Sequence, residues 1–129
     1  MHTLMPGFAL RGGKPWLAFG TRGADGQPQT ALQILNALLD FGLDLQAAVE
    51  APRWAHGAPG GRYPASALVL ERRFGDEAAE QLAQRGHEVM LADSVDPVMG
   101  TAQTIQVDHE RGCSIAATDP RGDGVALAL

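Results

Sequence analysis

A glycine-rich segment from Phe19 to Gln29 constrains the fold of this chain more than any other feature of its sequence. It follows an apolar stretch with the composition of a strand and precedes a strongly apolar helix pattern. Glycines allow positive φ and close approach of the backbone to a ligand, and the start of a helix adds unpaired N–H groups. Such a loop is able to bind a carboxylate, a phosphate or a reaction oxyanion. It also fits a tight connection that binds nothing.

The helix that we expect after this loop covers residues 30–41. After Thr30 its polar residues share one narrow face, so we expect the helix to be mostly buried. Gly42 has the position of a C-terminal cap. Asp44 has the position of an N-cap for a shorter helix, which must end near Pro52.

Both ends of the chain carry the pattern of a β-hairpin. Residues 8–19 form two apolar stretches around Gly12-Gly13, which suits a tight turn, and residues 102–117 form two stretches around a polar turn. Between the hairpins we expect an irregular loop over residues 56–64, strands over 67–70 and 87–91, and an amphipathic helix over 76–85. The order β-β-α-α-β-α-β-β-β predicts a mixed α/β or α+β fold in one domain, 1–129.

Composition argues against several classes of function. The net charge of −5 and the lack of a basic cluster disfavour a nucleic-acid partner. No apolar stretch approaches the roughly 20 residues of a membrane span. The single cysteine, Cys113, excludes an internal disulfide, and its apolar neighbours predict a buried thiol. The histidines lack ligand-like spacing, so we expect no metal and no cofactor. Residues 1–7 lack a signal-peptide pattern, which leaves the compartment undecided.

Six segments, taken in order, resemble the C-terminal part of the small subunit of the gamma-glutamyltranspeptidase family. They are Gly13-Lys14-Pro15-Trp16, the glycine-rich segment, Asp40-Phe41-Gly42-Leu43-Asp44, Ala51-Pro52-Arg53, Gly100-Thr101-Ala102-Gln103-Thr104-Ile105 and Ala117-Thr118-Asp119-Pro120-Arg121-Gly122-Asp123-Gly124. Each segment is short, but together they cover nearly the whole chain in the expected order and spacing.

The resemblance implies the fold of the N-terminal-nucleophile hydrolases, an αββα sandwich of two sheets flanked by helices. It also implies a precursor that cleaves itself into a large and a small subunit. The freed N-terminal Thr of the small subunit attacks a γ-glutamyl carbonyl, and the resulting acyl-enzyme passes to water or an amine. This chain would hold a C-terminal portion of that sandwich, with a mixed or antiparallel sheet and flanking helices.

The resemblance places the backbone N–H groups of Gly23 and Ala24 as donors to the reaction oxyanion, where the family usually has two glycines. An alanine keeps the donor if its φ stays negative, so Ala24 weakens this assignment without excluding it. His2 and Thr3 match the two serines that bind the α-carboxylate of the substrate. Thr3 keeps a hydroxyl and His2 does not, which weakens strict γ-glutamyl specificity. A frayed terminus is the alternative for both.

The glycine-rich segment is closer to a divergent branch of the family that is similar to acylases and amidases. Gln27-Pro28-Gln29 stands where typical members carry Ser-Arg. Arg53 and Arg121 each follow a proline, and we expect both to pair with acids or helix carbonyls rather than with substrate. Asp119 is expected to fix its turn through Asx-type hydrogen bonds.

No Thr of this chain stands where the family has its nucleophile. We therefore interpret the chain as a fragment of a precursor that is inactive alone. Its partners would be the large subunit, the rest of the small subunit and a γ-glutamyl or other acyl-amide molecule. A fragment would expose apolar faces, so self-association is also expected. The alternative is a free-standing, non-catalytic binding or assembly domain.

Overall fold

A computed structural model describes residues 4–57 and 59–127 of the chain; His2 and Thr3 lie outside these residues. Seven strands and three helices follow one another in the order β1, β2, α1, α2, β3, β4, α3, β5, β6, β7. Their bounds are β1 Gly7–Arg11, β2 Lys14–Thr21, α1 Gln27–Leu39, α2 Leu45–Glu50, β3 Trp54–His56, β4 Ala67–Glu71, α3 Asp76–Gln84, β5 Glu88–Ala92, β6 Ala102–Asp108 and β7 Cys113–Thr118.

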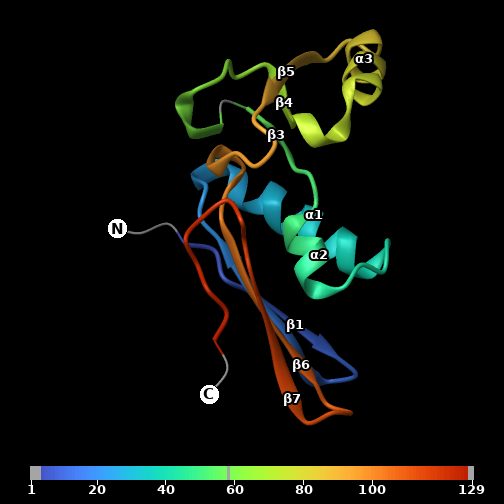
Figure 1. The fold of residues 1–129 in the computed structure, drawn as a ribbon, viewed down its shortest axis with the longest axis vertical. Coiled ribbons are helices and arrows are strands. Elements are labelled where there is room, and N and C mark those ends of the chain that lie inside the picture. The colour runs from blue at the N-terminus through green and yellow to red at the C-terminus, as the bar shows by residue number, and fades with distance from the viewer. Residues whose placement is uncertain (1–3, 58, 128–129) are drawn as a thin grey trace.

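The strands form two separate sheets. The first is antiparallel with the order β1-β2-β6-β7. The second has the order β3-β4-β5, in which β4 and β5 are parallel and are joined through α3. The molecule is elongated, with the three-stranded sheet and α3 at one end, the four-stranded sheet at the other, and α1 and α2 between them (Figure 1). This is the mixed α+β architecture that the sequence predicts.

The first hairpin is set by its two turn glycines. Gly12 and Gly13 have φ of 58° and 76°. Two successive residues with positive φ give a turn whose twist matches that of paired strands, and glycine adopts this conformation without a steric penalty. Arg11 then lies over the ring of Trp16, with 3.9 Å from its guanidinium carbon to the ring centroid.

The two central helices begin and end close to where their sequences predict. Pro28 occupies the first turn of α1, where its missing N–H costs nothing. The Asp44 side chain caps α2 by accepting a hydrogen bond from the Ala47 N–H at 2.8 Å. Gly42, with φ of 66°, turns the chain between the two helices.

The expectation that residues 30–41 are mostly buried is wrong. The helix ends at Leu39, and Leu32, Leu39 and Phe41 are 51%, 56% and 77% exposed. Its Ile34 face packs on the four-stranded sheet, where the main core cluster lies. That cluster consists of Trp16, Leu17, Ile34, Leu45, Val49, Ala102 and Ala117. The other apolar face of α1 is not covered by any of the described residues.

The opposite face of the four-stranded sheet is also open. The strand register places Phe8, Ala18, Ile105 and Ala116 side by side across all four strands. Phe8 and Ile105 are 64% and 49% exposed. An apolar sheet face of this kind is normally covered by a second layer. Its exposure here is what a fragment of a two-sheet sandwich is expected to show.

Two local predictions fail for physical reasons. Cys113 is exposed rather than buried, because it begins β7 next to the surface turn 109–112. The strand β3 was not expected; it consists of only Trp54, Ala55 and His56, which is too short to show a two-residue period.

Candidate active site

The glycine-rich loop connects β2 to α1 within five residues. Arg22 and Gly23 follow the strand, and a short 3-10 turn, Ala24–Gly26, leads into the helix. The Gly26 N–H donates to the Gly23 carbonyl at 2.8 Å and closes the turn. The loop therefore joins strand and helix by a sharp reversal.

Ala24 has a φ of +46° and is the one non-glycine residue with positive φ in the part of the chain that the structure describes. A negative φ, the condition under which an alanine keeps the donor without strain, is therefore not met. The reversal requires left-handed backbone here, where an L-residue costs about 1–2 kcal/mol because its Cβ crowds the following carbonyl. The two glycines that the family usually carries would avoid this cost.

The backbone N–H groups of Gly23 and Ala24 are adjacent donors. Within residues 4–57 and 59–127, neither one donates a hydrogen bond to another protein group. A cavity of about 180 Å³ lies beside them, lined by residues 23–26, Gln29, His56, Gly57 and 59–61. Successive N–H groups in a tight loop form a concave site for negative charge. An anion or a developing oxyanion is thus the ligand that this loop suits.

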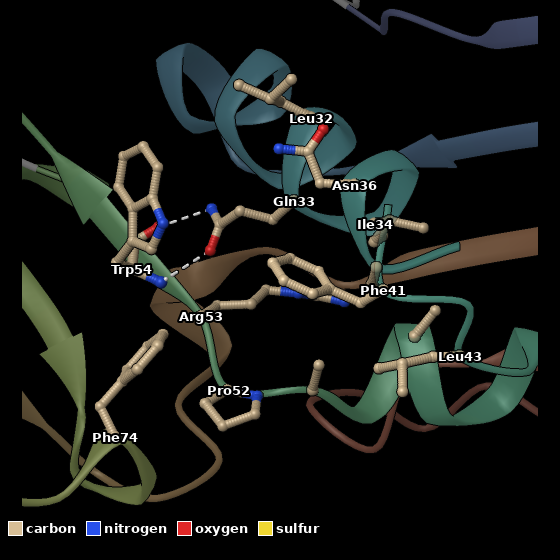
Figure 2. A pocket seen from close by; sticks show the side chains of 13 residues that line it. Leu32, Gln33, Ile34, Asn36, Phe41, Leu43, Pro52, Arg53, Trp54 and Phe74 are labelled. Carbon is tan, nitrogen blue, oxygen red and sulfur yellow. Dashed lines mark hydrogen bonds between the residues drawn. The ribbon is translucent and has the colours of Figure 1, made fainter. Parts of the chain in front are cut away.

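Two glutamines of α1, one helical turn apart, hold β3 against the helix. Gln29 accepts from the His56 N–H at 2.8 Å and donates to the His56 carbonyl at 2.9 Å. Gln33 makes the same pair of bonds to Trp54, at 3.0 and 2.9 Å (Figure 2). The two amides thus satisfy the backbone groups on the edge of β3 that faces away from β4. Sequence reasoning missed this clamp; its signal is a pair of glutamines at i and i+4.

A second hollow, of about 290 Å³, lies further along α1, beside Leu32 to Ala37 (Figure 2). Its walls include the apolar side chains Leu32, Phe41, Trp54 and Phe74. Arg53 borders it, but the guanidinium of Arg53 is paired with Asp119. This hollow offers apolar packing rather than groups for chemistry.

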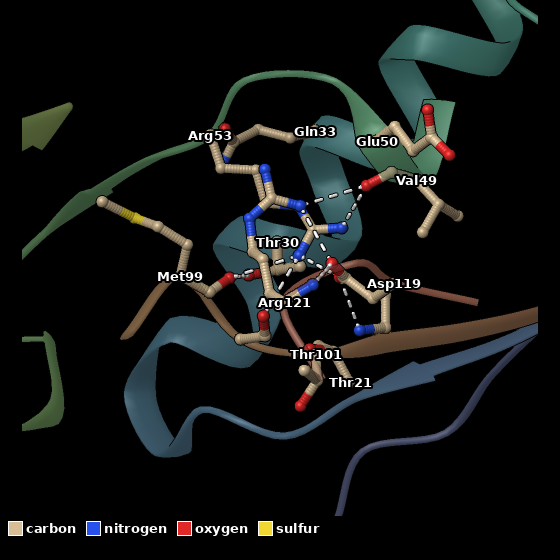
Figure 3. Close-up of polar contacts among 12 residues, drawn as sticks. Thr21, Thr30, Gln33, Val49, Glu50, Arg53, Met99, Thr101, Asp119 and Arg121 are labelled. Carbon is tan, nitrogen blue, oxygen red and sulfur yellow. Dashed lines mark hydrogen bonds and ion pairs between the residues drawn. The ribbon is translucent and has the colours of Figure 1, made fainter. Parts of the chain in front are cut away.

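A buried network of four charged side chains stands behind the loop. Arg53, Glu71, Asp119 and Arg121 are each no more than 3% exposed. Arg53 Nη1 lies 2.6 Å from Asp119 Oδ2, and Arg121 Nη1 lies 3.0 Å from Asp119 Oδ1 (Figure 3). Arg121 binds Glu71 with both Nε and Nη2, each at 2.6 Å. A third arginine, Arg73, reaches the network from its edge: its Nη2 lies 2.8 Å from Glu71 Oε2, and its side chain is 30% exposed.

Most of the remaining hydrogen-bonding groups of the network bind backbone, but Arg53 Nε has no partner among the described residues. Arg53 Nη2 and Arg121 Nη2 donate to the carbonyls of Val49 and Ala51, both at 2.8 Å, at the C-terminal end of α2. Asp119 accepts from the Ala102 N–H at 2.8 Å and, in an Asx-type turn, from the Arg121 N–H at 3.0 Å. These contacts confirm the structural role expected for both arginines and for Asp119.

Burial and pairing oppose each other in setting the pKa values of the network. Burial lowers the pKa of Arg53, and the neighbouring charge of Arg121 adds to this. Burial alone would raise the pKa of Glu71, but hydrogen bonds from Arg121 and from the Arg53 N–H hold it below its usual range. Burial alone would lower the pKa of Arg121, but its bonds to Glu71 raise it. Glu71 therefore stays ionised and fully occupied, which disqualifies it as a general base.

The described residues hold no group of three or more His, Cys, Asp or Glu side chains placed to bind a metal ion. Nor does any helix in ranges 4–57 and 59–127 have the length and apolar character to cross a membrane.

The gamma-glutamyltranspeptidase family model matches residues 1–129. The chain is 42% identical over 128 residues to the glutathione hydrolase-like YwrD proenzyme of Bacillus subtilis (strain 168), a match that covers 99% of this chain and 24% of that protein. It is 35% identical over 125 residues to the oxamate amidohydrolase proenzyme of Klebsiella pneumoniae subsp. pneumoniae, covering 97% of this chain and 23% of that one.

The fold agrees with these matches. A crystal structure of cephalosporin acylase from Bacillus halodurans superposes with a TM-score of 0.85 at 33% identity, over 99% of this chain and 23% of that chain. The two sheets and their helices thus match part of an N-terminal-nucleophile hydrolase fold. The chain spans about a quarter of the length of the curated relatives it matches. Because the family model extends over every residue, this chain belongs to the gamma-glutamyltranspeptidase family.

Proposed function

We propose that this chain supplies the oxyanion-binding part of the active site in an acyl-transferring amidohydrolase or transferase. The observation that carries the proposal is the pair of adjacent N–H groups at Gly23 and Ala24, which have no acceptor among the described residues. The resemblance assigns both groups to the position at which the family binds the oxyanion. In the alternative of a tight connection water would satisfy both donors, so it is the cavity beside them that favours a ligand.

The reaction would begin with the hydroxyl of an N-terminal Thr that lies elsewhere in the full-length protein. Its oxygen forms a bond to the amide carbonyl carbon, its proton passes to the α-amine of the same residue, and the carbonyl oxygen becomes negative. The Gly23 and Ala24 N–H groups stabilise that charge. Collapse of the intermediate breaks the C–N bond, the amine leaves with the proton, and water or an amine then takes the acyl group.

The substrate class that we propose is an acyl amide, with γ-glutamyl amides as one member. Thr3 would bind a carboxylate through its hydroxyl, whereas His2 replaces the second serine with a larger, aromatic donor. A site that lacks one matched hydroxyl discriminates less strongly for its ligand. The two relatives named above, a glutathione hydrolase-like proenzyme and an oxamate amidohydrolase proenzyme, are named for different substrates, which supports a class wider than γ-glutamyl amides.

The partners that we propose are the large subunit and the rest of the small subunit. Two apolar surfaces support this: the open face of the four-stranded sheet around Phe8 and Ile105, and the exposed side of α1 around Leu32 and Phe41. Contiguous apolar surfaces of this kind are normally covered by another part of the protein or by a partner. The isolated chain would associate with itself through them.

The test compares the purified 129-residue chain with the full-length protein that contains it. We expect the processed full-length protein to release p-nitroaniline from γ-glutamyl-p-nitroanilide or another acyl anilide. The isolated chain should release none, because it lacks the nucleophile. A robust rate from the isolated chain that Thr3→Ala abolishes would overturn the proposal. Inactivity of the full-length protein on a panel of acyl anilides would instead favour a binding or assembly role.

A further inference from the structure

The turn that precedes β6 touches the candidate oxyanion loop at one glycine. Gly100 follows the 3-10 turn Pro97–Met99 and has φ of 84° and ψ of 167°. A Cβ added to it would lie 2.7 Å from the Arg22 carbonyl oxygen and 2.7 Å from Thr21 Oγ1. A Cβ at these distances would clash with both oxygen atoms. Glycine is therefore required at this position for steric as well as conformational reasons.

The Arg22 carbonyl belongs to the same peptide group as the Gly23 N–H. A peptide group is planar and trans, so its N–H points opposite to its carbonyl. Whatever fixes the direction of the Arg22 carbonyl therefore fixes the direction of the Gly23 N–H.

Two hydrogen bonds act on this peptide group and its neighbour. The buried Thr21 hydroxyl donates to the Arg22 carbonyl at 2.8 Å. The Arg22 N–H donates to the Thr101 carbonyl at 3.3 Å. The backbone of Gly100 closes the third side, at a distance that leaves no room for a methyl group.

The Gly100 turn is itself held from behind. Thr30 Oγ1 donates to the Met99 carbonyl at 3.0 Å, and Arg53 Nη1 lies 3.4 Å from the carbonyls of both Met99 and Gly100 (Figure 3). Arg53 is fixed by Asp119 at 2.6 Å. The Gly100 turn therefore packs firmly against the Arg22 carbonyl, and the buried ion network holds this turn in place.

We propose that Gly100 and Thr21 are positioning residues that set the direction of the Gly23 N–H toward the reacting carbonyl oxygen. This inference rests on the proposed function of Gly23. Neither residue touches substrate; both act through the Arg22–Gly23 peptide group.

The chain offers a closely matched control for Gly100. Gly75 also follows a 3-10 turn, Arg72–Phe74, and its φ of 83° and ψ of 158° are nearly those of Gly100. No atom lies within 4 Å of the position of a Cβ on Gly75. Gly75→Ala thus imposes the same backbone strain as Gly100→Ala but creates no contact with the loop.

The experiment measures kcat and KM for an acyl anilide in the processed full-length protein. We expect Gly100→Ala to lower kcat about 100-fold, the usual effect of losing one oxyanion donor, with KM changed less than about 3-fold. Gly75→Ala should change neither. Thr21→Val removes the hydroxyl without adding bulk at the loop, and we expect it to lower kcat about 10-fold, while Thr21→Ser restores most of the rate.

Crystal structures of the same variants separate the inference from the function on which it rests. If Gly100→Ala rotates the Arg22–Gly23 peptide group and kcat falls, both stand. If the peptide group rotates and kcat does not change, Gly23 is not an oxyanion donor and the proposed function fails. If the peptide group keeps its orientation, or if Gly75→Ala lowers kcat equally, the positioning role is refuted. If Gly100→Ala does not fold, Thr21→Val is the test. An unchanged kcat in Thr21→Val refutes the positioning role.

Discussion

Replacement of Arg121 by Met tests whether the buried ion network holds this fold together. Arg121 binds Glu71 through two bonds of 2.6 Å and Asp119 through one of 3.0 Å, and it donates to two backbone carbonyls. Methionine retains much of the volume but removes the buried partner of Glu71, which then keeps only Arg73, a side chain that is 30% exposed. Loss of one member of a buried ion pair costs about 3–5 kcal/mol. Since a domain has about 5–15 kcal/mol of stability, this is a large share of the total.

Arg111 provides the matched control. Its Nε lies 3.6 Å from Asp108 Oδ2, and its side chain is 77% exposed. An exposed pair of this kind contributes at most about 0.5–1 kcal/mol, so Arg111→Met should change stability little. The measurement is urea unfolding of the 129-residue chain followed by circular dichroism. If Arg121→Met costs no more than Arg111→Met, the network does not have the structural role that its geometry indicates.

The pH dependence of the Arg121→Met effect has a definite sign. Because pairing holds the pKa of Glu71 below its usual value, the stability from this pair is fully present above about pH 4.3, the ordinary glutamate value. It is lost as the pH falls toward the folded-state pKa. In the variant, Glu71 loses the hydrogen bonds and the charge of Arg121 that hold its pKa down, so protonation of this buried carboxylate costs less. The difference in unfolding free energy should therefore shrink between pH 7 and pH 4; a constant or growing difference would contradict the assignment.

Three further changes test other parts of the fold. Ala24→Gly should stabilise the chain by about 0.5–1 kcal/mol in urea unfolding, because relief of the left-handed alanine exceeds the entropy cost of glycine; an equal loss would be inconsistent with the φ of +46°. Gln33→Ala should speed hydrogen exchange of the Trp54 N–H while the His56 N–H stays protected, and uniform exchange at both would rule out separate clamps. Ile105→Glu should reduce self-association in sedimentation velocity; a wild-type monomer at all concentrations would exclude the open face as an association surface.

Local signals in the sequence predicted the elements that depend on neighbouring residues. Gly12 and Gly13 specify the first hairpin because both turn positions need positive φ, and Asp44 specifies the start of α2 because its carboxylate caps the helix. These effects act over a few residues, so the sequence alone suffices to find them. Gly42 was predicted as the cap of the preceding helix, but Asp40 is the C-cap and Gly42 turns the chain two residues later.

Features that depend on distant contacts were not predictable in this way. Glu71 pairs with Arg121 across 50 positions, and no pattern in the sequence connects them. The three residues of β3 are held as a strand by β4 on one edge and by Gln29 and Gln33 on the other, and all of these contacts are distant in the sequence. Exposure of Leu32 reflects the lack of a covering layer in this chain rather than the polarity of its helix.

The candidate site depended on both kinds of information. The resemblance assigned Gly23 and Ala24 as oxyanion donors by position. It did not indicate the positive φ of Ala24 or the close contact between Gly100 and the Arg22 carbonyl. A steric requirement between two loops nearly 80 residues apart is visible only once the chain is folded. The glycine in the Gly100-Thr101 segment could be recognised as part of a family motif, but its contact with the Arg22 carbonyl could not.

The most direct test of the central claim is a crystal structure of the full-length processed protein carrying a tetrahedral phosphonate adduct on its nucleophile. The account predicts that one phosphonate oxygen, standing for the oxyanion, lies about 2.7–3.1 Å from the backbone nitrogens of both Gly23 and Ala24. An adduct whose oxygen is bound by other donors, with both nitrogens more than about 4 Å away and beyond hydrogen-bonding range, would contradict it.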